Sequence, residues 1–199
     1  MVGLRRSLPP LANCARTAHG PTRRHPRRNH SRRSLPGDAP ADGRVTLDRF
    51  DDPEHAIALV DARYACLAAA DPTLANNLSI AAPEDLRHWH YGDQLRAIRR
   101  HDTTIGVLAI VPGAIGWITG EEINEEVISE PHVGQGYAAS AQTAWARHVA
   151  ADADKLLIGT VDRHNHASRA TAQRVGRPRV LDDIFIALRA SGIPLRDTM

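Results

Sequence analysis

The sequence lacks several features that would mark particular classes of protein. It has only two cysteines in 199 residues, Cys14 and Cys66, and their spacing fits neither a metal site nor a redox motif. We therefore expect a reducing, cytoplasmic compartment. The histidine pairs at 88–90 and 164–166 have no cysteine near them and no third ligand, so no metal site is predicted. No apolar run reaches the roughly 18 residues of a membrane-spanning helix, so no membrane partner is expected.

Positive charge is divided unevenly along the chain. Residues 1–43 contain nine Arg and two Asp, a net charge of +7, whereas the remaining residues contain 16 basic and 21 acidic groups. The first segment is rich in Pro, Arg, His and Ser, so we expect 1–43 to be a disordered tail and 44–199 to be one domain. Such a tail suits a tether to nucleic acid or to an anionic surface, a transit peptide, or a plain unstructured extension. No aromatic residue lies among its arginines to stack on bases, so a nucleic-acid partner is not expected.

The apolar pattern after the tail alternates between strand and helix periods. Asp52 and Pro53 predict the start of the first helix, and Gly92 predicts the end of the second. "HDT" and the "PGA" stretch at 112–114 predict turns between strands. The predicted order is strand 44–50, a helix from Pro53, helix 83–91, strands 94–100, 104–111 and 115–129, a helix to Val149, strand 155–161, helix 165–176 and strand 183–189. This order indicates an α+β fold with a mixed, mostly antiparallel central sheet flanked by helices.

Two close glycines follow the glutamate-rich strand and open an alanine-rich helix. Glycines at a helix N-terminus allow backbone amides to approach an anion, so Gly134 and Gly136 predict an anion site. Together with Ala139 they also satisfy the dinucleotide fingerprint G-x-G-x-x-A. However, the strand "EEINEEVIS" carries four glutamates where a Rossmann strand would be buried on both faces. "EPH" also separates this strand from the glycines where a tight turn is needed, so the dinucleotide interpretation is not favoured.

Two motifs resemble the GNAT superfamily of acetyl-CoA-dependent N-acetyltransferases. "HVGQGYA" (132–138) is similar to the family's Arg-Gly-x-Gly-x-Ala, and "NHASRATAQRVG" (165–176) is similar to its Asn-x-x-Ser…Gly segment. The Asn-x-x-Ser form is closest to the branch that acetylates protein N-termini. The resemblance is firm over about residues 121–176. It implies a GNAT-like domain with acetyl-CoA as cosubstrate, whose acceptor is a primary amine of a small molecule or a protein N-terminus. The amine would attack the thioester directly.

The resemblance also implies where the cosubstrate would bind. The CoA pyrophosphate would lie against the amides at the start of the helix. The end of the glutamate-rich strand would pair with the pantetheine arm and offer an N–H to the oxyanion, and Asn165 would bind the same arm. The implied cofactor-binding set is Val127, Ile128, Ser129, Val133, Gly134, Gln135, Gly136, Tyr137, Ala138, Ala139, Asn165 and Ser168.

Catalytic candidates follow from the same resemblance. Glu122 matches the place where some members keep the glutamate that takes the amine's proton. Glu125 and Glu126 should lie on opposite faces of one strand, and we favour Glu122 and Glu125 as candidate bases. The tyrosine that serves many members as an acid is replaced by Ala172, which leaves Ser168 as the candidate acid and Tyr137 as a poorer one.

One further departure from the family pattern concerns the phosphates. Val133 stands where the family has Arg or Gln, so one phosphate contact is missing. Together with the missing tyrosine, this departure favours the alternative, a CoA-binding or partner-binding module that has the same fold and little or no activity. Members of the family are often dimers, so a homodimer is compatible with the resemblance.

Overall fold

The computed structural model describes residues 42–149 and 155–182. Most of the predicted tail, 1–41, and the strand predicted over 183–189 lie outside the described residues. The described residues up to Pro178 belong to one compact unit. Residues 179–182 belong to a second unit, within which Arg179 forms an ion pair with Asp182.

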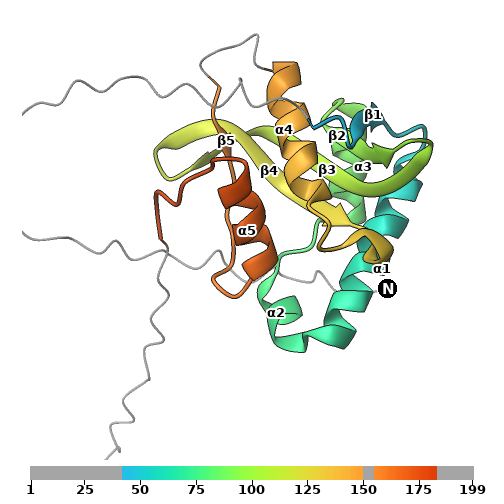
Figure 1. Ribbon diagram of the computed structural model, residues 1–199, viewed down its shortest axis with the longest axis horizontal. Coiled ribbons are helices and arrows are strands. Elements are labelled where there is room, and N and C mark those ends of the chain that lie inside the picture. The colour runs from blue at the N-terminus through green and yellow to red at the C-terminus, as the bar shows by residue number, and fades with distance from the viewer. Residues whose placement is uncertain (1–41, 150–154, 183–199) are drawn as a thin grey trace, which may run out of the picture. The chain divides into compact units, whose positions relative to one another are not determined.

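A five-stranded sheet forms the centre of the described residues (Figure 1). Its strands are adjacent in chain order: β1 (Thr46–Arg49), β2 (Leu95–Arg100), β3 (Thr103–Ile115), β4 (Ile118–Ile128) and β5 (Leu157–Ile158). The pairings from β1 to β4 are antiparallel, and β5 pairs with β4 in parallel. The predicted mixed, mostly antiparallel sheet flanked by helices is therefore confirmed.

Most helices begin and end where the sequence predicts. Asp52 caps the first helix, accepting a hydrogen bond from the backbone N–H of Glu54 at 3.0 Å. A short helix that was not predicted follows it, capped by Asp71, which accepts from the N–H of Leu74 at 2.9 Å. The helices are α1 (Pro53–Ala70), α2 (Pro72–Asn77), α3 (Pro83–Tyr91), the 3-10 turn η1 (Glu130–His132), α4 (Tyr137–Val149) and α5 (His166–Arg174). None of the helices in the described ranges has the length and apolar character that crossing a membrane requires.

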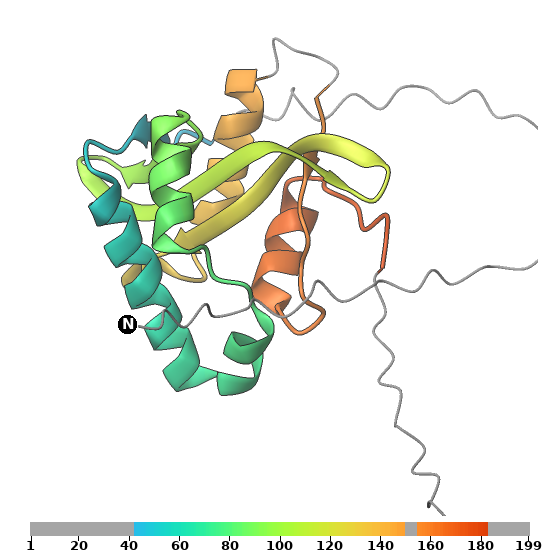
Figure 2. The same cartoon turned by 180° about the vertical axis from the view of Figure 1, so that it is seen from behind.

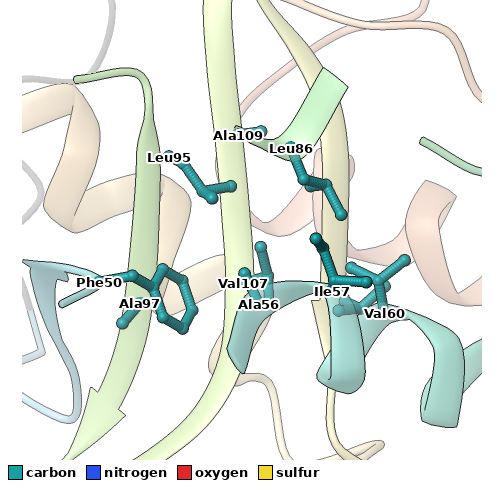
Figure 3. Packing of buried hydrophobic residues seen from close by; sticks show 10 residues of the cluster. Phe50, Ala56, Ile57, Val60, Leu86, Leu95, Ala97, Val107 and Ala109 are labelled. Atoms are coloured by element: carbon teal, nitrogen blue, oxygen red, sulfur yellow. The ribbon is translucent and has the colours of Figure 1, made fainter. Parts of the chain in front are cut away.

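The helices cover the two faces of the sheet. α1 and α3 lie on one face and α4 on the other, as the two opposite views show (Figures 1 and 2). On the first face the buried side chains of α1 and α3 meet those of the central strands (Figure 3): Phe50, Ala56, Ile57, Val60, Leu86, Leu95, Ala97, Val107, Ala109 and Val127. On the second face the core consists of Val45, Ile98, Ile105, Leu108, Ile110, Tyr137 and Ala141. Each face therefore has its own apolar layer.

The hairpin of β3 and β4 is longer than predicted. The turn predicted at 112–114 is wrong, because these residues lie inside β3 and pair with β4. The chain reverses at Gly116, whose φ is 61°. Proline is tolerated at position 112 because β2 pairs with β3 only as far as Ala109, so no strand on that side needs its missing N–H.

The register of β3 and β4 shifts by one residue at Asn124, which has no cross-strand partner. This β-bulge determines which way the glutamates of β4 point. Glu122 and Glu125 lie opposite Val111 and Ala109, so both point to the face covered by α1 and α3. Glu126 points to the other face, toward α4, as predicted for neighbouring residues of a strand.

Candidate functional site

The start of α4 presents a concave run of backbone amides. Gly134 and Gly136 have φ values of 77° and 83°, in the left-handed region that glycine adopts without strain. Ser140 donates its backbone N–H to the carbonyl of Gly136 at 3.1 Å, so the amides of residues 137–139 precede the first intrahelical bond. The N–H of Val133 instead donates to Glu130 at 3.3 Å. The predicted anion site therefore begins at Gly134.

Two arginines that the sequence motif does not contain lie at these amides. A pocket of about 440 Å³ is lined by Gly134, Gly136, Arg44 and Arg174. The two guanidinium groups come within 3.5 and 3.6 Å of the position that a Cβ on Gly136 would occupy. Arg44 is held by a 2.9 Å hydrogen bond to the carbonyl of Gln135. These arginines supply the positive charge that valine at 133 cannot.

The other polar side chains of this pocket already have hydrogen-bond partners. Asp42 also lines it, and its carboxylate accepts the hydroxyl of Ser140 at 2.5 Å and the N–H of Arg44 at 3.1 Å. Tyr137 does not face the pocket as a free hydroxyl group. It is buried in the core, with the guanidinium of Arg44 4.5 Å from its ring centre. Within the described lining, two arginines therefore oppose a single carboxylate.

Among the residues that the structure describes, no strand pairs with the outer edge of β4 beyond its first residues. β5 pairs with β4 only at Glu121 and Glu122. Ser129 donates its N–H to Ile105 of β3 at 2.8 Å, and its carbonyl accepts from His132, so its backbone is already paired. Because N–H direction alternates along a strand, Val127 also faces β3 and Ile128 faces the open edge. Of the predicted residues 127–129, Ile128 is the one whose backbone can bind a ligand there.

Asn165 and Ser168 come together at the start of α5. The side-chain oxygen of Asn165 accepts the backbone N–H of Ser168 at 3.0 Å and so caps the helix. The amide NH₂ of Asn165 is not used by this cap. Ser168 is half-buried in the first turn of α5.

The histidines considered as metal ligands have other neighbours. His90 is buried, with its Nε2 2.7 Å from the carbonyl oxygen of Phe50. Trp89 is partly buried and packs against the core. The Nε2 of His164 lies 2.9 Å from Nε of Arg163. Across the ranges that the structure covers, no cluster of three or more His, Cys, Asp and Glu side chains could hold a metal ion.

Glu125 is buried and accepts three hydrogen bonds. The hydroxyl of Tyr64 and the N–H groups of Ala81 and Glu126 each donate to it at 3.1 Å. Burial raises the pKa of this carboxyl, and the three donors offset part of that rise. Burial and the neighbouring Glu125 raise the pKa of Tyr64 as well. Glu125 therefore joins β4 to α1 and to the segment before α3.

Glu122 has quite different surroundings on the same face. Its side chain lies against Gly113, where a Cβ would collide with the carboxylate. It is half-buried, and no described residue forms a hydrogen bond or ion pair with its carboxylate. Burial raises its pKa above the ordinary value. A carboxylate with free lone pairs and a raised pKa is suited to accept a proton.

A third group of polar residues, on the opposite face, was not predicted as a site. Gln142 of α4 donates to the carboxylate of Glu126 at 2.8 Å and accepts from the guanidinium of Arg177 at 3.0 Å. Burial raises the pKa of Glu126 to about 7, although Gln142 and Arg177 act against it. Burial also lowers the pKa of Arg177. No sequence motif contains these three residues, because they come from three separate elements.

Comparison with known proteins gives distant matches. No protein-family model and no curated protein matches the chain. A GNAT-family acetyltransferase from Bacillus anthracis is similar over 67% of this chain and 79% of its own, with 16% identity and a TM-score of 0.48. An acetyltransferase from Agrobacterium tumefaciens is 26% identical over 67% of this chain and 80% of its own, with a TM-score of 0.45. AAC(6')-Iy, solved with a bisubstrate analogue containing CoA, is 13% identical over 73% and 97%, with a TM-score of 0.49. At this distance, the function must be inferred from the site of the chain itself.

Proposed function

We propose that this chain is an N-acetyltransferase of the GNAT superfamily that moves an acetyl group from acetyl-CoA to a primary amine. The observation that carries the proposal is the pocket at the start of α4, where amides from Gly134 to Ala139 meet Arg44 and Arg174. A pyrophosphate suits this combination because it accepts several N–H groups and pairs with guanidinium groups. The two arginines take the role that the missing side chain at Val133 would have.

The open edge of β4 supports the placement of the pantetheine arm. Ile128 offers its N–H and carbonyl on that side, so an amide of the arm can pair with it as a strand would. An arm that runs from the α4 pocket along this edge reaches the point where β4 and β5 separate. The thioester would therefore lie near Glu122 and Ile158, which form the last pair of the two strands.

Glu122 is the base that the site favours. The amine nitrogen would attack the thioester carbon beside Glu122, which lies six residues along β4 from Ile128, so the N–H of Ile128 serves the pantetheine arm and not the oxyanion. The amine's proton would pass to Glu122, directly or through water. Glu125 would act by holding α1 beside the acceptor path, since its oxygens already accept three bonds. The acceptor is either a small amine or a protein N-terminus, and the expected cytoplasmic location remains a prediction.

The alternative is a module that binds CoA and has little or no activity. It is favoured by the alanine at position 172, where the family's acid would stand, and by the helix cap in which Asn165 already takes part. The two functions differ in one measurable way. In the presence of amines the enzyme releases CoA, with its free thiol, from acetyl-CoA, whereas the module binds acetyl-CoA and releases none.

The test uses thermal unfolding of the full chain with acetyl-CoA, CoA, NAD or no ligand. A ligand at a hundredfold its Kd stabilises by about 2.7 kcal/mol, which raises Tm by a few degrees. Arg44→Gln and Arg174→Gln should each weaken CoA binding about tenfold or more, since bonds to charged groups contribute about 1.5–3 kcal/mol. Arg87→Gln is the matched control, because Arg87 is exposed on α3 and pairs with Glu54.

The outcomes separate the candidates. A shift with both CoA species, reduced by about half or more in each pocket variant and kept by the control, supports the proposal. Release of free thiol with a panel of primary amines then distinguishes the enzyme from the module. A shift of Tm with NAD alone contradicts the proposed function. So does the absence of a shift with every ligand.

A further inference from the structure

Arg177 lies where β4 and β5 separate. The two strands pair at Glu122 and Ile158 and no further along the chain. A Cβ on Gly159, the next residue after β5, would meet the guanidinium of Arg177 at 2.9 Å and the side chain of Ile123 at 3.6 Å. Ile123 is the first residue of β4 beyond the pairing with β5. The guanidinium therefore lies at the start of the gap between the two strands.

This position is fixed by neighbouring polar groups rather than by a direct ion pair. The N–H of Arg177 donates to the carbonyl of Ala172 at 2.9 Å, which holds its backbone against the end of α5. Its Nη1 donates to Gln142 at 3.0 Å, and Gln142 in turn donates to Glu126 at 2.8 Å. Among the described residues no acceptor bonds the other guanidinium nitrogen, Nη2, which is the one beside Gly159. An arginine with unused donors in this place can bind a negative group that enters the gap.

Glu126 controls how much of this positive charge is available. Its Oε1 is buried and has no hydrogen-bond partner among the described residues. Because burial raises the pKa of this carboxyl to about 7, much of it is neutral near neutral pH. A neutral Glu126 holds Gln142 in place without cancelling the charge of Arg177. The three residues thus form an arginine site with a weak counter-charge.

We propose that Arg177 stabilises the thiolate that leaves when the thioester of acetyl-CoA is broken. This inference rests on the proposed function, which places the thioester at the separation of β4 and β5. The amine nitrogen bonds to the carbonyl carbon and loses its proton to Glu122. The carbon–sulfur bond breaks, its electron pair stays on sulfur, and the thiolate later takes up a proton from water. Arg177 acts by charge, since a guanidinium does not release its proton, and so serves where Ala172 offers no acid.

Glu122 and Arg177 are well placed for this division of roles. Glu122 points to the face covered by α1 and α3, whereas Arg177 bonds to Gln142 of α4 on the opposite face. The attacking amine would approach the thioester from one face of the sheet and the sulfur would leave toward the other. The base for the amine and the cation for the sulfur would then lie on different sides of the tetrahedral intermediate and would not compete for one place.

The experiment measures the thiol of CoA bound to the full chain, so it needs no knowledge of the acceptor. Ultraviolet absorbance of the thiolate is followed as the pH is raised, with free CoA as reference. A neighbouring arginine lowers a thiol pKa, and we expect about tenfold more thiolate in the bound state at neutral pH. Arg177→Gln should abolish this excess and Arg177→Lys should keep part of it. Glu126→Gln should increase it further, because it removes the counter-charge.

Two additional variants keep the test decisive. Since Arg177→Gln leaves Glu126 buried without a cation, the double variant with Glu126→Gln is measured beside it, so that no charge is left unpaired. Arg87→Gln, on the exposed face of α3, should leave the bound thiol unchanged. A purely structural role for the three residues would change stability but would not move the thiol titration in opposite directions.

The failures are distinguishable. CoA that binds with the titration of free CoA, in the natural chain and in every variant, overturns this inference and leaves the proposed function standing. The inference is overturned in the same way if Arg177→Gln tightens CoA binding without moving the thiol titration, because Arg177 would then block the gap. Absence of any CoA binding contradicts the proposed function and this inference together.

Discussion

Replacing Glu126 with glutamine should remove a pH-dependent loss of stability. Burial raises the pKa of this carboxyl from the ordinary value of 4.5 to about 7 in the folded chain. A carboxyl with a raised folded pKa binds its proton more tightly when folded than when unfolded. Its contribution is therefore fully present below about pH 4.5 and is lost as the pH rises through about 7. A difference of about 2.5 pKa units, at about 1.4 kcal/mol per unit, corresponds to about 3 kcal/mol.

The assay is urea unfolding of the full chain and of Glu126→Gln from about pH 5 to about pH 8. The free energy of unfolding of the variant minus that of the natural chain should rise by up to about 3 kcal/mol across this range. The attraction of Arg177 acts only where Glu126 is ionised, and because it lowers the pKa of Glu126 it is already contained in the value of about 7. Glu84→Gln, an exposed glutamate of α3, is the control and should give a nearly flat difference. A difference for Glu126→Gln that does not change with pH would refute the reasoning.

Three further substitutions test the packing around the site, each by urea unfolding. Glu125→Ala leaves the hydroxyl of Tyr64 and two backbone N–H groups without their acceptor, and should lower the free energy of unfolding by about 3 kcal/mol or more. A loss within about 0.5 kcal/mol would show that water replaces the carboxylate. Gly106→Ala would bring a Cβ to 2.3 Å from the carbonyl oxygen of Val127, so it should separate β3 from β4 and destabilise the fold by several kcal/mol. Near-normal stability would contradict the register of β3 and β4. Leu95→Ala empties a fully buried position and should cost about 2–5 kcal/mol, and a smaller loss than about 1 kcal/mol would mean that the core closes around the gap.

The parts of the fold that the sequence predicts are those determined by neighbouring residues. Asp52 and Pro53 set the start of α1 because a cap and a first-turn proline act within one turn. The same rules could have found α2, since Asp71 and Pro72 repeat the pattern. The turn predicted at 112–114 failed for a different reason. Whether a proline can lie inside a strand depends on where the neighbouring strand ends, and that is a property of the assembled sheet.

The residues of the candidate site also fall into two groups, those that neighbouring residues determine and those that only the assembled fold brings together. Gly134 and Gly136 could be recognised from sequence because their conformation is local and only glycine adopts it readily. Arg44 could not, since it bonds to Gln135 across 91 positions of the chain and stands at the predicted boundary of the disordered tail. Arg177 was equally hidden, because a single arginine after a helix has no pattern until the sheet and α4 surround it.

The bulge at Asn124 links these observations. A regular strand would place residues 122 and 125 on opposite faces, since side chains alternate with a period of two. The extra residue brings Glu122 and Glu125 onto one face, and Glu126, beyond the bulge, faces α4 together with Ile123. The proposed proton acceptor, Glu122, and the arginine network consequently lie on different sides of β4, although Glu122 and Glu126 are only four positions apart in the strand. One unpaired residue thus places similar glutamates on both faces of β4, which is the arrangement that our proposal uses for the amine on one side and the departing sulfur on the other.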